Sequence, residues 1–353
     1  MGCANCNEQI KYVFLDKTQI ESKEYIRLLQ AIHGESGYVS RIKRINHYLE
    51  SGDFKLLVAI KNGRMIGQAS AFKVTAVIRG KEQDLYWGCD TFLLPESRGM
   101  GIGKQLQYRL HQACPNFSSA WYSPINGIIK KKCGCKELID LKFTYYPVSD
   151  FFGMLCQLAS AKILKHRICF KASIPYLYYN FNNIWCNSKL DSYDIVEIPY
   201  QELNQEISDF MEYALQDYDF HVKRSLVFLK WVYGWKLGKY HMLAFKRDNK
   251  IQAIVSFSEV HQATHVIASF QGVSVFDLII HPKSTITRKD ILMYVIGFYK
   301  RRKEQLDGLI TFEQIKYFPK FTYPWPSSPL LSTYREKVSN GYLSFIDQDL
   351  DQF

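Results

Sequence analysis

Residues 85–114, LYWGCDTFLLPESRGMGIGKQLQYRLHQAC, contain the pattern that decides the fold. Leu85–Leu94 is rich in aromatic and aliphatic residues and stops at Pro95, which predicts a buried strand. Arg98–Gly103 then carries three glycines at alternate positions, and Lys104–Cys114 has the apolar spacing of an amphipathic helix. A glycine-rich turn before a helix N-terminus suits phosphate, because converging N–H groups and the helix dipole favour an anion. The stretch therefore predicts a phosphate-binding loop.

The glycine spacing narrows the choice of phosphate ligand. Lys104 is not followed by Ser or Thr, so the loop is not that of a P-loop nucleotide-binding protein. Gly99, Gly101 and Gly103 alternate throughout, which also excludes the dinucleotide-binding fingerprint. The pattern Arg98-x-x-Gly101-x-Gly103, after Leu-Leu-Pro-Glu-Ser and before an amphipathic helix, resembles the acyl-CoA pyrophosphate loop of the GNAT superfamily of N-acyltransferases. A purely structural strand-turn-helix connection is the alternative.

The elements around the loop extend this resemblance. Alternating and helical apolar spacings predict two helices, an antiparallel hairpin, the central strand, the loop with its helix, and then a strand, a helix and a closing strand. Asn62-Gly63 is a strong hairpin turn between the first two strands. This order resembles a GNAT lobe, an α/β (α+β) fold with a mixed, mainly antiparallel twisted sheet flanked by helices. The expected elements are Ser22–His33, Ser40–Leu49, Lys55–Lys61, Arg64–Phe72 continued by Val74–Ile78, Leu85–Leu94, Lys104–Cys114, Phe117–Tyr122, Pro124–Cys133 and Leu141–Pro147.

The second half of the chain repeats the first. Leu56–Gly67 aligns with Met242–Ala253, and Asp90–Ser97 aligns with Asp277–Ser284 at nearly the same offset. A repeat of this kind predicts duplicated lobes. The residues after Ser284 contain no glycine up to Asp290, so the second lobe lacks the phosphate loop. We expect a first GNAT-like lobe over residues 1–150, a helical connector over 151–190, and a second, degenerate GNAT-like lobe over 191–353.

The resemblance implies which residues contact an acyl-CoA donor, expected to be acetyl-CoA. In the family the fourth and fifth strands splay apart, and the pantetheine arm pairs with the exposed backbone of the fourth strand. Asn126 lies where the family often places an asparagine that contacts the CoA arm. The implied cofactor contacts are Phe92, Leu93, Leu94, Arg98, Gly99, Met100, Gly101, Ile102, Gly103, Lys104 and Asn126.

The chemistry requires a base for the acceptor ammonium and an acid for the departing thiolate. Asp90 is a fourth-strand carboxylate at the position of a common family base. The alternative is that Asp90 is a structural carboxylate, and the matching Asp277 of the second lobe favours this alternative. The family often places a tyrosine as the acid where this chain has Lys130, which we expect at the surface. Tyr122, at the end of the fifth strand, is the alternative proton donor.

Composition limits the class of protein. The chain has 353 residues, a net charge of +11 and 47% hydrophobic residues, which favours folded lobes and an anionic partner such as CoA. Its short, scattered basic runs match no nucleic-acid-binding motif. No apolar run is long enough to span a bilayer, and no signal peptide opens the chain. Nine cysteines without ligand spacing indicate reduced thiols, no metal site and a cytoplasmic protein.

Two functions follow from these expectations. The first is an acetyl-CoA-dependent N-acetyltransferase that acts on a small-molecule or sugar amine. The second is a silent acyl-CoA-binding protein that senses CoA or acts as a scaffold. The intact loop supports both functions, and the sequence defines neither the acceptor nor the oligomeric state.

Overall fold

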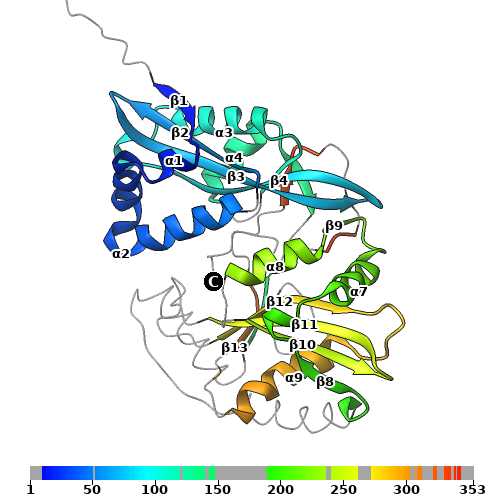
Figure 1. The fold of residues 1–353 in the computed structure, drawn as a ribbon. Coiled ribbons are helices and arrows are strands. Elements are labelled where there is room, and N and C mark those ends of the chain that lie inside the picture. The colour runs from blue at the N-terminus through cyan, green and yellow to red at the C-terminus, as the bar shows by residue number, and fades with distance from the viewer. Residues whose placement is uncertain are drawn as a thin grey trace, which may run out of the picture. The chain divides into compact units, whose positions relative to one another are not determined.

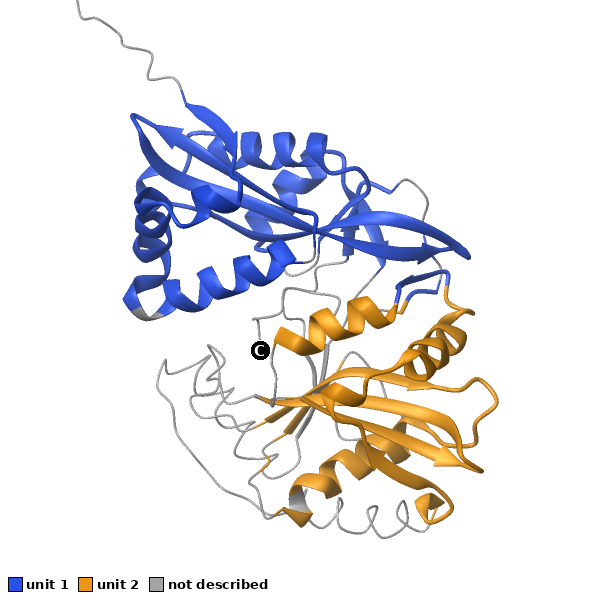
Figure 2. Ribbon diagram, in the orientation of Figure 1, with its two compact units in different colours: residues 1–141, 219–223, 328–341 blue, residues 142–218, 224–327, 342–353 orange. Residues whose placement is uncertain are grey.

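The computed structural model forms two compact units. Unit 1 comprises residues 1–141, 219–223 and 328–341, and unit 2 comprises residues 142–218, 224–327 and 342–353 (Figure 2). Residues 151–188, which hold nearly all of the expected connector, lie outside the described residues. The structure describes residues 10–50, 52–119, 122–139, 143–147, 189–235, 240–260, 272–302, 306, 308–311, 321–323, 330–334, 338 and 340–342.

Unit 1 is built on a mixed sheet with the order β1-β2-β3-β4-β5-β15-β6, and β9 pairs with the far end of β3. The hairpin between β2 and β3 turns at Asn62 and Gly63, whose φ values of 51° and 76° confirm the predicted tight turn. The strands are β1 (Lys11–Phe14), β2 (Phe54–Lys61), β3 (Arg64–Ile78), β4 (Lys81–Leu93), β5 (Phe117–Ser119), β6 (Lys136–Ile139), β9 (Phe220–Val222) and β15 (Leu330–Ser332).

Helices cover both faces of this sheet (Figure 1). After the short α1 (Lys17–Ile20), α2 (Lys23–Glu50) packs against β3. Non-helical backbone at Gly34, with φ of 73° and ψ of 176°, divides α2 into two helices, as the sequence predicted. On the opposite face, α3 (Ile102–Ala113) packs against β2 and β3, and α4 (Pro124–Lys132) packs against α3. The apolar faces of α2 and α3 share one core with the sheet.

Strands β4 and β5 pair only over a short distance and then separate. Their parallel pairing covers Tyr86 with Phe117 and Trp87 with Ser118. Immediately beyond it, the register between β3 and β4 shifts at Asp90, whose φ of 43° lies in the left-handed region. A bulge of this kind bends the strand, and β4 continues beyond it paired with β3 alone. The rest of β4 therefore has a backbone edge without a strand partner on the β5 side among the described residues.

Unit 2 contains a second mixed sheet with the order β14-β7-β13-β12-β11-β10-β8. The predicted second hairpin, β10 and β11, and the predicted central strand β12 pair in one antiparallel run, and their apolar residues form the core with α9 (Arg288–Arg301). The strands are β7 (Phe143–Pro147), β8 (Asp194–Glu197), β10 (Tyr240–Arg247), β11 (Lys250–Val260), β12 (Gly272–Ile280), β13 (Gly308–Thr311) and β14 (Phe321–Tyr323); the other helices are α7 (Gln205–Leu215) and α8 (Leu226–Trp235).

Both sheets take strands from distant parts of the sequence: the first takes β9 and β15, and the second takes β7. The strand that we expected to close the first lobe, Leu141–Pro147, instead forms β7 of the second sheet, between β13 and β14. The expected position of this strand was therefore wrong. In the first sheet, β15 from the C-terminal region lies between β5 and β6. Local apolar patterns define a strand but not its partner, so this exchange is not visible in the sequence.

Candidate active site

The loop after β4 has the backbone geometry that its glycines predicted. Gly99 and Gly101 have φ values of 80° and 76°, in the left-handed region that residues with a Cβ rarely adopt. Gly101 is the N-cap of α3 and supplies no side-chain cap, so the first N–H groups of the helix are not capped from within that residue. Arg98 and Lys104 on either side of these glycines are exposed. The loop thus offers backbone donors, a helix dipole and two cations to an anion.

The strand that enters the loop has one edge without a strand partner among the described residues. Phe92 and Leu93 pair with β3 on one side only, and Leu94 donates its N–H to the Ile66 carbonyl at 2.9 Å. Gly103 lies over this strand, because a Cβ there would lie 3.3 Å from Leu93 Cδ1. The glycine therefore allows α3 to approach β4 closely. Of the other loop residues, Met100 is exposed and Ile102 is buried.

Asn126, on the first turn of α4, directs an unsatisfied acceptor inward. Its Oδ1 atom is buried and has no hydrogen-bond partner among the described residues. Its backbone N–H is already capped by Ser123 Oγ at 3.2 Å, so the helix itself does not need the side chain. A buried carbonyl oxygen without a partner is costly. An N–H donor from a bound ligand would remove that cost.

The equivalent helix start in unit 2 is closed by its own side chains. Thr287 donates its backbone N–H and its hydroxyl to Asp290 Oδ2 at 3.0 and 2.6 Å. Asp290 in turn donates its N–H to Thr287 Oγ1 at 3.2 Å. The Asp290 carboxylate thus occupies the place where an anionic ligand would bind, in agreement with the absence of glycine in this loop.

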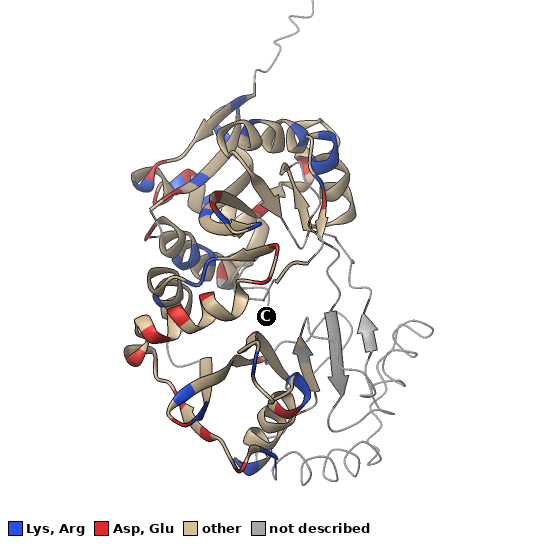
Figure 3. Ribbon diagram, turned by 90° about the vertical axis from the view of Figure 1, so that its right-hand side faces the viewer, with Lys and Arg blue, Asp and Glu red and all other residues tan. Residues whose placement is uncertain are grey.

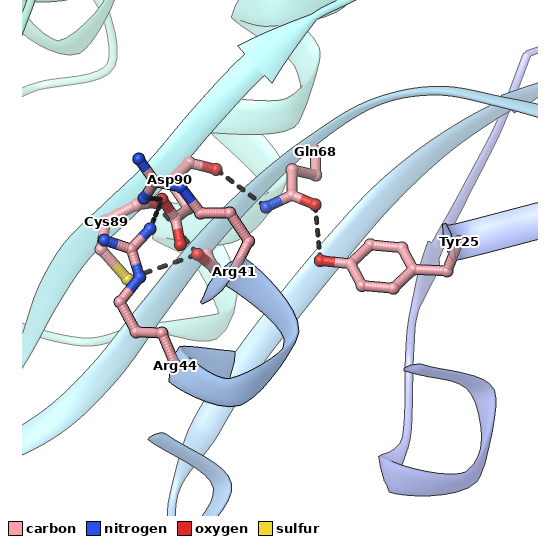
Figure 4. A network of polar contacts seen from close by, with 7 residues as sticks. Tyr25, Arg41, Arg44, Gln68, Cys89 and Asp90 are labelled. Atoms are coloured by element: carbon pink, nitrogen blue, oxygen red, sulfur yellow. Dashed lines mark hydrogen bonds and ion pairs between the residues drawn. The ribbon is translucent and has the colours of Figure 1, made fainter. Parts of the chain in front are cut away.

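Asp90 lies at the β4 bulge in a network of charged and polar side chains. Its Oδ1 atom accepts hydrogen bonds from Arg44 of α2 and from Arg41, the latter at 3.1 Å. Gln68 donates to the Asp90 carbonyl at 3.3 Å and accepts from the Tyr25 hydroxyl at 2.7 Å (Figure 4). The Asp90 side chain is only 5% exposed, and that of Arg44 is fully buried. This carboxylate neutralises a buried guanidinium, which is a structural role, and its role as a base stays a prediction.

The same arrangement occurs at the bulge of β12. Asp277 forms an ion pair with Arg224 at 3.0 Å, and both side chains are fully buried. Tyr233 donates to Ser256 Oγ at 2.5 Å, and Ser256 Oγ accepts the Asp277 N–H at 3.0 Å. A tyrosine, a polar residue on the adjacent strand, an aspartate and an arginine thus recur in both units. The recurrence in a unit without a glycine loop supports the structural role of Asp90.

We expect Asp90→Asn and Asp277→Asn to destabilise the protein to a similar extent. Each substitution removes the carboxylate charge that pairs with a buried guanidinium, at a cost of about 3 to 5 kcal/mol. Thermal unfolding of both variants measures this effect, and Asp277→Asn is the matched control because it lies outside the candidate site. A base at Asp90 would add a second effect. Below the unfolding temperature, Asp90→Asn would then lose far more turnover than Asp277→Asn.

Lys130 is buried, so its expected place at the surface was wrong. Only 3% of the residue is exposed, and its ammonium group donates a hydrogen bond to Ser119 Oγ. Burial lowers the pKa of Lys130 to about 8. Tyr122, the predicted proton donor, is buried beneath it with its ring centroid 5.3 Å from Nζ, and burial raises the pKa of its phenol. Sequence reasoning missed Lys130 because it is part of the exposed-looking run Lys130–Lys132; the sequence clue is its helical spacing from the buried Gly127.

Charged residues of both signs are distributed over the described chain. Lys and Arg residues are interspersed with Asp and Glu in the described parts of both units (Figure 3). Within the described part of the chain, no helix combines the length and the apolar character needed to cross a membrane.

Solved structures with similar folds place these observations in context. A conserved protein of unknown function from Enterococcus faecalis V583 matches 92% of the chain over 72% of its own length, with a TM-score of 0.57 and 11% identity. A GCN5-related N-acetyltransferase from Anabaena variabilis matches with the same coverage and identity and a TM-score of 0.56. The chain has a tandem GNAT fold. Saccharomyces cerevisiae N-myristoyltransferase, solved with myristoyl-CoA, matches 93% of the chain over 83% of its own length, with a TM-score of 0.54 and 11% identity.

These likenesses confirm the predicted fold class, two GNAT-like lobes in one chain. They concern the fold alone, because the identities are near one residue in ten. No family model matches the sequence, and no curated protein matches it either.

Proposed function

We propose that the protein is an acyltransferase that transfers the acyl group of an acyl-CoA, expected to be acetyl-CoA, to an amine. The observation that carries this proposal is the left-handed glycine loop at the uncapped start of α3, directly after a strand whose edge is free of β5. The loop would hold the pyrophosphate through backbone N–H groups, with Arg98 and Lys104 adding positive charge. One chemical group, the CoA pyrophosphate, thus accounts for every unusual feature of the loop.

The rest of the donor would extend along β4. The amides of a pantetheine arm can pair with the backbone of Phe92 to Leu94, as an added strand pairs with a sheet edge. The inward Oδ1 atom of Asn126 would accept a donor N–H from the same arm. In this arrangement the thioester would lie near the point where β4 and β5 separate. A backbone N–H on the free edge of β4 can polarise the thioester carbonyl and stabilise the charge that develops on its oxygen.

An assay of CoA release from acetyl-CoA across a panel of amines, including amino sugars, tests the proposed activity. A long-chain donor belongs in the same panel, because the yeast enzyme of similar fold was solved with myristoyl-CoA. Binding without CoA release for every amine would favour the silent acyl-CoA-binding protein. Absence of binding to any acyl-CoA would contradict both functions.

We expect calorimetry with acetyl-CoA to give one site per chain. The physical reason is the contrast between the uncapped glycine loop of α3 and the start of α9, where the Asp290 carboxylate would repel a phosphate. Two equivalent sites per chain would contradict the assignment of binding to the first lobe.

Arg98→Ala together with Lys104→Ala should weaken this site by about tenfold or more at low salt, with a smaller effect at high salt.

A further inference from the structure

Helix α4 is inverted with respect to ordinary amphipathic helices. Ile125 and Ile128 are 73% and 57% exposed, whereas Lys130 on the opposite side is 3% exposed. Helices normally bury the isoleucines and expose the lysine, since desolvating an ammonium group costs several kcal/mol. A violation of this local rule is expected mainly at functional sites. The burial of Lys130 therefore calls for a function.

The ammonium group of Lys130 lies where β4 and β5 separate. The ammonium group donates to Ser119, the β5 residue that follows Ser118, where the pairing of β5 with β4 ends. Ser119 Oγ donates in turn to the Gly88 carbonyl of β4 at 3.5 Å. The rings of Phe117 and Tyr122 flank Nζ at centroid distances of 5.6 and 5.3 Å. The hydrogen bond to Ser119 and the two aromatic rings hold the ammonium group of Lys130 in one position.

No carboxylate among the described residues forms an ion pair with Lys130. The titratable groups that act on its charge or surround it are Cys89 of β4, Cys135 before β6, His111 of α3 and Tyr122. Burial and the charge of Lys130 lower the pKa of His111 to about 4, so His111 is neutral near pH 7. Burial raises the pKa of Cys135 to about 12, so it is a neutral thiol. The ammonium group thus lacks a permanent counter-charge, and an anion that forms nearby would gain from it.

We propose that Lys130 is the catalytic acid that donates a proton to the sulfur of the departing CoA. This inference rests on the proposed acyltransferase function. A donor anchored at the loop and extended along β4 from Leu94 back to Cys89 covers five residues, about 16 Å of strand. An extended pantetheine arm has a comparable length, so the sulfur would lie beside Cys89 and Lys130 Nζ.

The proton balance of the step is complete. The acceptor nitrogen forms a bond to the thioester carbonyl carbon, and the carbon–sulfur bond breaks with its electron pair on sulfur. Sulfur takes a proton from Lys130, which becomes a neutral amine. The acceptor nitrogen releases its own proton to solvent, and Lys130 takes up a proton from solvent after CoA leaves. The lowered pKa of Lys130, about 8, is close to that of an ordinary thiol, about 8.5, so the transfer is nearly balanced.

The test uses the full-length protein and bound CoA, because it then needs no acceptor. The thiolate absorbance of CoA is titrated in the wild type and in Lys130→Met, with desulfo-CoA complexes as blanks that cancel the protein thiols. We expect the pKa of the bound thiol to be about one to three units lower in the wild type than in Lys130→Met. Lys132→Met is the matched control, since Lys132 is exposed on the same helix, and it should titrate like the wild type.

Turnover provides the second readout. With any amine that the panel identifies, kcat of the wild type should fall as pH rises above about 8, because the acid must be protonated. Lys130→Met should lose this fall and lower kcat at least about tenfold with little change in KM. Identical CoA titrations in wild type and Lys130→Met would overturn the proposal for Lys130 alone. If neither protein binds CoA, the proposed acyltransferase function fails instead.

Discussion

Replacing Gly101 by valine should greatly weaken acyl-CoA binding, while the first lobe keeps its fold. No atom lies within 4 Å of the position that a Cβ would take at Gly101, so the new side chain would project into open space at the N-terminus of α3. A phosphate bound to the first N–H groups of that helix would need the same space. We expect the affinity for acetyl-CoA, measured by calorimetry, to fall at least about a hundredfold, close to 2.7 kcal/mol.

The substitution also has a conformational cost. With φ at 76°, a residue with a Cβ is strained at position 101 by about 1 to 2 kcal/mol, whatever the ligand does. Gly80 provides the matched control, because its φ is 73°, its Cβ position is equally open, and it lies in the turn before β4, at the end opposite the loop. Gly80→Val should lower the unfolding temperature to a similar extent and keep the wild-type affinity.

The comparison of the two variants separates strain from ligand contact. Equal affinities for Gly101→Val and Gly80→Val would show that the loop does not bind the donor. If Gly101→Val is too unstable to measure, Gly101→Ala places a smaller group in the same position and should still weaken binding about tenfold.

Those features of the candidate site that depend on neighbouring residues could be predicted from the sequence. The left-handed backbone at Gly99 and Gly101 needed only a local pattern, because glycine is the residue that adopts this conformation readily. The Asn62-Gly63 hairpin was predictable for the same reason. The repeated aspartate at Asp90 and Asp277 was also visible, and its presence in both units favoured a structural carboxylate; the structure places both aspartates in ion pairs.

The remainder depended on contacts between residues far apart in the chain. Arg44 pairs with Asp90 through the packing of α2 on the sheet, and no local pattern identifies that partner. The burial of Lys130 depends on Ser119, Phe117 and Tyr122 from the preceding strand and loop. Its neighbours Lys131 and Lys132 are exposed, so the run of three lysines resembled an ordinary solvated face.

The second large effect is expected from truncation of the chain, because the two lobes exchange strands. A chain that ends at Asp150 should not form the first lobe, although residues 1–150 contain the whole glycine loop. Such a fragment lacks β15, which pairs with β5 on one side and β6 on the other. β6 would lose its strand partner and β5 would keep only β4, so the backbone groups of Phe117–Ser119 would lose hydrogen bonds within the sheet.

The packing of β15 indicates the size of the loss. Leu330 and Leu331 are fully buried, and burial of each contributes about 1.5 to 3 kcal/mol. Ser332 accepts a hydrogen bond from Ser118 Oγ at 2.8 Å, and the Thr333 N–H donates to the Phe117 carbonyl at 2.8 Å. Together these contributions rival the whole stability of an ordinary domain, about 5 to 15 kcal/mol.

Circular dichroism and acetyl-CoA calorimetry on the fragment 1–150 measure the outcome, and we expect no cooperative unfolding and no binding. The fragment would also expose β7 without its neighbours from the second sheet, which favours aggregation. A matched chain joins residues 1–141 through a flexible Gly/Ser linker to residues 328–341, which restores β15 and omits β7. This chain should fold and bind. Binding of acetyl-CoA by the fragment 1–150 with the affinity of the full chain would show that the first sheet does not require the exchanged strand.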